Sequence, residues 1–221
     1  MTEPAILFEA CVESVAEAVA AERGGAGRVE LCVDLAVDGL TPPAEMIAGA
    51  CRALTIPVMV LVRPRAGGFH YSADEIDGMI GEVERIKAFG AAGVVVGALD
   101  ADGAVDRDAM TRLVSAARPM SVTFHRAFDV VADRSSALDA LIGLGVERVL
   151  TSGGATTAEL GIGVLQDLVR QAAGRIGILA GGGIRPQNVA RIVEAAGVHE
   201  VHAHTPAPAL VAALPRRPRG S

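Results

Sequence analysis

Short runs of apolar and β-branched residues alternate along the chain with longer segments in which apolar residues recur at helical spacing. Eight such runs lie near residues 6–11, 29–32, 58–63, 94–96, 122–125, 148–151, 176–180 and 201–204. Eight strands separated by helices predict an α/β fold of the TIM (β/α)8 barrel type, which usually has about 250 residues. A doubly wound open sheet is the alternative. No Gly-x-Gly-x-x-Gly turn follows the first run, however, as a dinucleotide fold would need.

The pattern weakens at the end of the chain. After the eighth run, only residues 209–214 favour a helix before a Pro- and Arg-rich end. We therefore expect one barrel domain over residues 1–206, with a shortened or missing eighth helix, and a short, partly disordered C-terminal segment over residues 207–221. Another subunit or a loop would then cover the joint between the first and last strands.

Alternate positions in the strands share a face, and in several strands one of the two faces is polar. The residues on this face are Glu9 with Cys11, Glu30 with Cys32, Thr123 with His125, and His202 with His204, and Arg63 ends the third run. The other face is apolar and would pack under the helices. Since active sites of such barrels form at the C-terminal ends of the strands, these polar groups predict a shared site there.

Two carboxylates, Glu9 and Glu30, would lie on adjacent strands about 4.8 Å apart. Both stay ionised only if cations flank them, and Arg63 and His125 are the candidates. One interpretation is a charge-compensated polar layer that fills the barrel. The other is a ligand site, in which Glu9 or Glu30 is a general base, His125 a general acid or electrophile, and Arg63 a charge partner.

Two glycine-rich loops follow late strands, and each brings bare amides close to a potential ligand. The chain places Ser152 and Gly153 after the sixth run, and Gly181, Gly182 and Gly183 after the seventh. Loops in this part of a barrel often hold phosphate, so they indicate an anionic group, although tight turns alone would also explain the glycines. Arg65 adds a guanidinium suited to carboxylate or phosphate.

The cysteines favour a metal as a second kind of ligand. Cys11 and Cys32 lie on neighbouring strands, and His202 is on the strand that closes the barrel beside Cys11. Thiolate with imidazole suits Cu(I) or zinc. The pattern contains no Cys-x-x-Cys, and isolated cysteines are often small core residues, as we expect of Cys51.

Composition narrows the classes of function. The 221 residues are 51% hydrophobic but only 3% aromatic, which suits parallel strands buried by helices. The net charge of -6 argues against nucleic acid as a partner. The first residues lack the basic region of a signal peptide and no run would span a membrane, so we expect a cytoplasmic protein with reduced thiols. Lys87 is the one lysine and lies in a helical stretch, so Schiff-base chemistry has no candidate in the core.

A series of motifs also resembles the CutC family, whose members are known as copper homeostasis proteins. The matching segments, in order, are Phe8-Glu9-Ala10-Cys11, Arg28 to Cys32, Gly39-Leu40-Thr41-Pro42, Arg63-Pro64-Arg65, Phe69 to Ser72, Gly97 to Asp100, Val122 to Asp129, Leu150 to Gly153 and Glu200-Val201-His202. The resemblance implies a TIM-barrel-like fold, a cytoplasmic homo-oligomer and a role in copper handling. It also implies that Cys11 and Cys32 match the family's cysteines proposed to bind copper.

Two hypotheses therefore stand. The first is a cytoplasmic copper-homeostasis protein that binds Cu(I) through Cys11 and Cys32. The second is an enzyme of unassigned reaction that acts on a small anionic or phosphorylated polyol-like molecule, without an organic cofactor.

Overall fold

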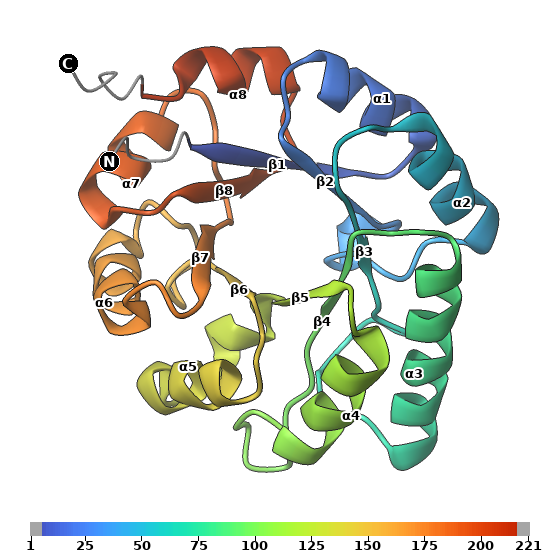
Figure 1. Ribbon diagram of the computed structural model, residues 1–221. Helices are drawn as coiled ribbons and strands as arrows, with labels where there is room; N and C mark the ends of the chain where they lie inside the picture. Colours follow the sequence, from blue (N-terminus) through green and yellow to red (C-terminus); the bar gives the residue numbers. More distant parts are fainter. Residues whose placement is uncertain (1–5, 216–221) are drawn as a thin grey trace.

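The computed structural model describes residues 6–215, in which eight parallel strands close into a barrel surrounded by helices (Figure 1). Each strand pairs with the next along the chain, and β8 pairs with β1. The strands are β1 (Leu7–Val12), β2 (Arg28–Leu31), β3 (Val58–Leu61), β4 (Gly93–Val96), β5 (Ser121–Phe124), β6 (Arg148–Thr151), β7 (Gly177–Ala180) and β8 (Glu200–Ala203). The TIM-type barrel that the sequence predicts is confirmed, and the open-sheet alternative is excluded.

Helices alternate with the strands and form the outer ring. They are α1 (Val15–Arg23), α2 (Ala44–Ala53), α3 (Ala73–Ala88), α4 (Arg107–Ala117), α5 (Arg134–Gly143), α6 (Ile162–Ala172), α7 (Val189–Ala196) and α8 (Ala207–Ala213), with 3-10 turns η1 (Leu35–Val37) and η2 (Arg126–Val130). Side-chain caps begin several of them. Ser72 accepts from the Glu75 amide while Glu75 reaches back to the Ser72 amide, so a capping box starts α3.

The outward faces of the strands and the inner faces of the helices form the main apolar core. Phe8, Leu31, Val60 and Phe124 are each at most 2% exposed within it. A smaller cluster inside the barrel contains Cys11, Cys32, Met59, Leu61 and Val95. The barrel axis is thus filled by side chains, as is usual for eight strands, and polar groups occupy the remaining inward positions.

The eighth helix is short, as predicted, but it covers the joint between the first and last strands. α8 packs against both α1 and α7, and Leu210 on its inner face is fully buried. A Cβ on Gly24 would lie 2.7 Å from Pro208, so glycine permits this close approach. No cover from another subunit is needed here, and the predicted homo-oligomer stays a prediction. The predicted disorder beyond Pro215 concerns residues outside the described range.

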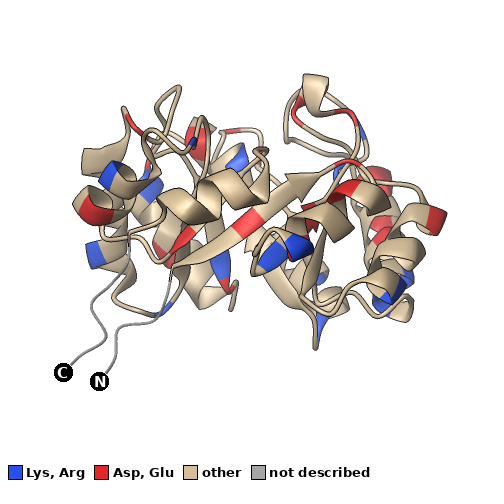
Figure 2. Ribbon diagram, turned by 90° about the horizontal axis from the view of Figure 1, so that it is seen from above, with Lys and Arg blue, Asp and Glu red and all other residues tan. Residues whose placement is uncertain are grey.

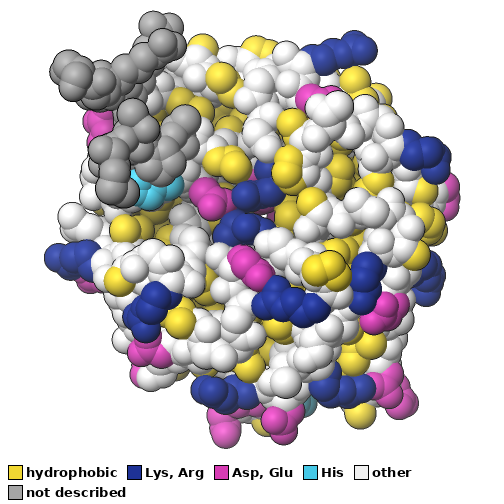
Figure 3. Space-filling view, viewed as in Figure 1, with side chains coloured by type: hydrophobic (Ala, Val, Ile, Leu, Met, Phe, Trp, Pro, Cys, Tyr) yellow, Lys and Arg dark blue, Asp and Glu magenta, His cyan; other side chains and the backbone are white. Residues whose placement is uncertain are grey.

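Charged side chains gather around the barrel axis at one end (Figure 3). At the N-terminal ends of the strands, Arg28 pairs with Glu9 and Glu200, and Arg148 donates to Thr123 and Ser121. Elsewhere, basic and acidic positions are interspersed over helices and loops (Figure 2). In the described part of the chain, no helix has the length and apolar character needed to cross a membrane.

Candidate functional site

A cavity of about 660 Å³ opens at the C-terminal ends of the strands. Its polar lining combines thiols, imidazoles, carboxyl groups and guanidinium groups. These residues are Cys11, Glu30, Cys32, Asp38, Arg63, His125, Arg126, Asp129, Arg185, His202 and His204. The cavity is within the size range of small-molecule sites. The structure therefore brings together the predicted residues Cys11, Glu30, Cys32, Arg63, His125 and His202.

The two thiols are in contact. Cys11 Sγ and Cys32 Sγ lie 3.6 Å apart, and both side chains are buried. The hydrogen bond with Cys32 and burial raise the pKa of Cys11 well above its usual value, with the Glu30 charge acting in the same direction. Cys11 is therefore a neutral thiol near neutral pH, and a metal would have to displace its proton. Cys51 lies apart from this pair, half-buried in α2.

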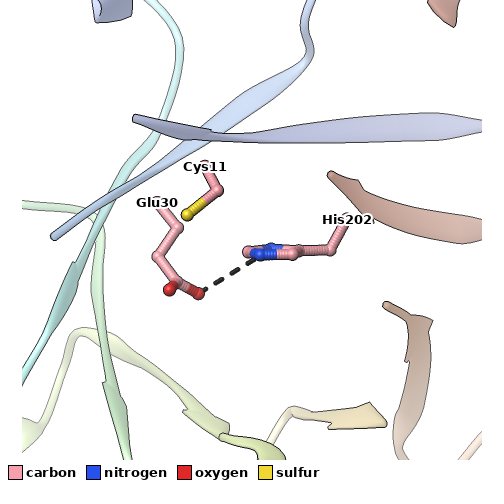
Figure 4. Close-up of side chains that lie close together, drawn as sticks. All are labelled: Cys11, Glu30 and His202. Carbon is pink, nitrogen blue, oxygen red and sulfur yellow. Dashed lines mark ion pairs between the residues drawn. The ribbon is translucent and has the colours of Figure 1, made fainter. Parts of the chain in front are cut away.

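Among the described residues, Cys11, Glu30 and His202 place potential metal-ligand atoms within 4.8 Å of one another (Figure 4). His202 Nδ1 is 3.9 Å from Glu30 Oε2, and that oxygen has no hydrogen-bond partner. Burial raises the pKa of Glu30 to about 7, and the charge of Glu9 adds to this, while His202 and Arg28 oppose it. Glu30 can thus exchange a proton near neutrality, as a general acid or base must.

Glu9 lies on β1, two residues before Cys11, and is fully buried. It accepts from Arg28 and from His202 Nδ1, the latter at 2.9 Å. Burial raises the pKa of Glu9, but the hydrogen bond from His202 and the charge of Arg28 outweigh it and hold the pKa at about 2. The expectation that Arg63 and His125 flank the carboxylates was wrong. Arg28 and His202 do so, because Glu9 lies opposite Arg28 in the β1–β2 register.

Arg63 has another role, since its guanidinium anchors loops at the rim of the cavity. It donates to the backbone oxygens of Val37, Gly39 and Gly67 at 2.6 to 3.0 Å. Its own backbone is held by Thr41, whose hydroxyl accepts from the Arg63 amide. Nε of Arg63 is buried without a partner. Arg63 therefore fixes the η1 loop.

His125 is buried between Phe69 and Gly97. The His125 and Phe69 ring centroids are 4.9 Å apart, and a Cβ on Gly97 would lie 2.5 Å from the His125 ring. Its Nδ1 accepts from the Ala127 amide, so the proton of the neutral ring is on Nε2, which has no partner. Burial, and then the charge of Arg63, lower the pKa of His125 to about 3. His125 is a neutral donor, not the cation that the sequence suggested.

The depressed pKa of His125 predicts a loss of stability in mild acid. The unfolded chain takes up a proton near pH 6.5 while the folded one takes it up near 3, so stability falls as pH decreases through this window. Between pH 6 and pH 5 we expect His125 to contribute a loss of about 1 kcal/mol in the free energy of unfolding. Urea denaturation of the wild type and a His125→Asn variant measures it. Parallel pH profiles for the two proteins would contradict the assignment.

The glycine loop after β6 already holds an anion, which is the carboxylate of Asp129. Asp129 Oδ1 accepts from the amides of Ser152 and Gly154, both at 3.0 Å, and from the Thr151 hydroxyl. Oδ2 accepts from the Ser152 hydroxyl and from Arg126. The Gly153 amide donates to Thr151 Oγ1. The predicted anion site at Ser152 and Gly153 is thus filled by the protein's own side chain.

The loop after β7 differs from the β6 loop in its amides. Gly181 donates to the Thr151 carbonyl, but within the described residues the amides of Gly182 and Gly183 donate to no protein acceptor. Both Gly182 and Gly183 line the cavity and have positive φ, at 96° and 71°. Arg65, also predicted to bind an anion, is outside the lining. Its guanidinium pairs with Glu75 and lies over the Tyr71 ring.

Sequence reasoning missed Arg28, Arg126, Asp129 and Arg185. Arg28 could have been found, because it precedes Glu30 by two residues and so shares its face. Arg126 and Asp129 lie in η2, and Arg185 in the loop before α7. The directions of these three side chains depend on loop geometry, which the two-residue period of a strand does not describe.

Comparison with known proteins agrees with this fold. A model of the CutC family matches residues 6–206. The mouse (Mus musculus) copper homeostasis protein cutC homolog is 47% identical over 196 residues, which cover 89% of this chain and 72% of that protein. A CutC family protein of Xanthomonas axonopodis pv. citri is 49% identical over 196 residues, covering 89% and 82% of the two chains.

Solved structures extend the comparison. A crystal structure of a CutC protein from Streptococcus agalactiae aligns with a TM-score of 0.86 at 32% identity, covering 90% of this chain and 98% of that one. An aldolase aligns with a TM-score of 0.68 at 16% identity, covering 92% and 91%, and this likeness shows the barrel fold alone. From the family model and these relatives we conclude that the chain belongs to the CutC family.

Proposed function

We propose that the protein binds Cu(I) through Cys11 and Cys32 and serves in cytoplasmic copper handling. The main support for this proposal is the contact of the two thiols in the lining of the cavity, where their sulfur atoms are 3.6 Å apart. A metal at about 2.3 Å from two thiolates in tetrahedral geometry holds them roughly 3.8 Å apart. The thiols thus lie close to the required spacing, and soft thiolate ligands select Cu(I).

His202 is the proposed third ligand. The carboxylate of Glu9 is an acceptor only, so Nδ1 of His202 carries the proton of their hydrogen bond. Burial lowers the pKa of His202, but the charges of Glu30 and Glu9 outweigh it and raise the pKa, so a metal at Nε2 would displace a proton there. A carboxylate behind a ligating histidine fixes its tautomer and orientation, as in many metal sites. Glu30 supplies a hard oxygen donor, which Cu(I) does not prefer. We therefore assign Glu30 to the surroundings of the site.

Location and assembly form part of this proposal. Cys11, Cys32 and Cys51 are all free, which fits a reducing compartment such as the cytoplasm. Relatives named for copper homeostasis support the copper role. We keep the homo-oligomer as an expectation that light scattering tests.

A Cys11→Ser, Cys32→Ser double variant is expected to weaken Cu(I) binding by about 100-fold or more, because hydroxyl oxygens replace both soft donors. Competition with a chromogenic Cu(I) chelator under anaerobic conditions measures the affinity. The matched control is Cys51→Ser, which alters a thiol outside the cavity and should bind as the wild type does.

Full-strength Cu(I) binding by the folded double variant would remove the copper proposal. Equal losses in the double variant and in Cys51→Ser would also count against it, since binding would then not depend on the paired thiols.

A further inference from the structure

The cavity has a second set of donors, on the side of β7 and η2. The free amides of Gly182 and Gly183 lie there, and the Arg126 guanidinium packs against Gly182, where a Cβ would be 3.5 Å from Arg126 Cζ. Arg185 also lines the cavity and is exposed. Within residues 6–215 its side chain forms no ion pair or hydrogen bond. Two backbone amides and two guanidinium groups thus surround one end of the cavity.

Three buried side chains of the same cavity carry polar atoms that the protein leaves unused. They are Nε2 of His125, Nε of Arg63 and Oε2 of Glu30, on residues that are at most 5% exposed. Buried polar groups are rarely left without partners, and a ligand is one reason for leaving them so. His125 offers a donor and Glu30 an acceptor, which suits hydroxyl groups.

We propose that this cavity binds a phosphate monoester of a small polyol. The amides of Gly182 and Gly183 with Arg126 and Arg185 hold the phosphate, and His125 and Glu30 face the hydroxyls. The phosphate end of the cavity lies on the side of β7 and η2, and the Glu30 end adjoins Cys11 and His202, two of the proposed copper ligands.

The neighbouring β6 loop shows that this end of the barrel can hold an oxyanion. There the amides and hydroxyls of the loop, together with Arg126, surround the Asp129 carboxylate. The β7 loop offers the same kind of donors, but within residues 6–215 no acidic side chain accepts from the amides of Gly182 and Gly183. Of the acidic residues in the lining, Asp129 is already enclosed by donors, Glu30 adjoins Cys11 and His202, and Asp38 is on the η1 side. Two amides and two guanidinium groups suit the several acceptor oxygens and the negative charge of a phosphate.

The test is calorimetric titration of the metal-free, full-length protein with glycerol phosphate, inorganic phosphate and glycerol. We expect saturable binding of glycerol phosphate, competition by inorganic phosphate, and no binding of glycerol alone. An Arg185→Gln variant should bind glycerol phosphate about tenfold more weakly, because one charge-assisted partner is lost. Arg170→Gln is the control, since Arg170 is exposed on α6 and pairs with Asp167 away from the cavity.

Arg185 makes no side-chain contact that folding needs, so its variant should keep the wild-type melting temperature. NMR shifts of the Gly182 and Gly183 amides on addition of glycerol phosphate give a second reading. The titration uses metal-free protein, so glycerol phosphate binding and Cu(I) binding are measured separately. No saturable binding, unchanged affinity in Arg185→Gln, or shifts confined to other amides would each overturn the proposal.

Discussion

Replacing Arg28 by methionine is expected to lower the free energy of unfolding by about 3–5 kcal/mol, because the variant removes the guanidinium from a buried ion pair with Glu9, whose carboxylate keeps its hydrogen bond from His202. Glu9 is fully buried, and Arg28 is its ion-pair partner while also bonding Glu200. Methionine keeps much of the volume of the arginine stem, so the loss reports the charge more than a cavity. Urea denaturation at neutral pH measures it.

Arg112→Met is the matched control. Arg112 pairs with Asp77 on the surface, where half of the arginine side chain is exposed, and such pairs contribute about 1 kcal/mol or less. An Arg28→Met, Glu9→Gln double variant should recover part of the lost stability, since the unpaired charge is gone. If Arg28→Met lowered the free energy of unfolding no more than Arg112→Met does, the buried ion pair would contribute no more to stability than the surface pair.

The fold could be predicted from the sequence because local rules determine it. Each of the eight apolar runs became a strand within two residues of its expected bounds. Helix starts were less certain. A serine or threonine before an apolar helical pattern indicates a cap, and Ser72 does cap α3, whereas Thr41 bonds Arg63 and α2 begins at Ala44. A cap residue has several possible partners, and the tertiary structure selects among them.

The sequence predicted which face of each strand the site residues occupy, but not which of these residues form pairs. The two-residue period places Glu9, Glu30 and Cys11 on the inward side, where the structure has them. The stagger between strands is a property of the closed barrel, so the sequence could not show that Glu30 lies opposite Cys11 and not opposite Glu9. The cations beside Glu9 were misassigned for this reason.

Asp129 illustrates a second limit of prediction from the sequence. It follows β5 in the 3-10 turn η2, and its carboxylate reaches the β6 loop more than twenty residues later in the chain. Neither hydropathy nor strand period describes such a contact between loops. The glycines of the β6 loop therefore suggested a site for an external anion, whereas they accommodate an internal one.

An Asp129→Ala variant is expected to lose about 3 kcal/mol of stability, because the donors around the carboxylate lose their acceptor. The Asp129 side chain is 9% exposed and accepts from Ser152, Gly154, Thr151 and Arg126. Alanine leaves these donors unpaired and opens space for a small anion. Formate should then raise the melting temperature of the variant more than that of the wild type, by refilling the vacated position.

Sodium chloride at equal ionic strength controls for the screening of charges by salt. The Asp129→Asn variant controls for the space that alanine leaves, because asparagine fills it. Asparagine presents an amide donor to groups that are themselves donors, so it should destabilise the fold as well, yet it fills the position and should not respond to formate. A melting temperature that formate raises equally in all three proteins would show that the effect is one of solvent. Selective rescue of Asp129→Ala would instead demonstrate that the β6 loop is an anion site which the chain fills from within.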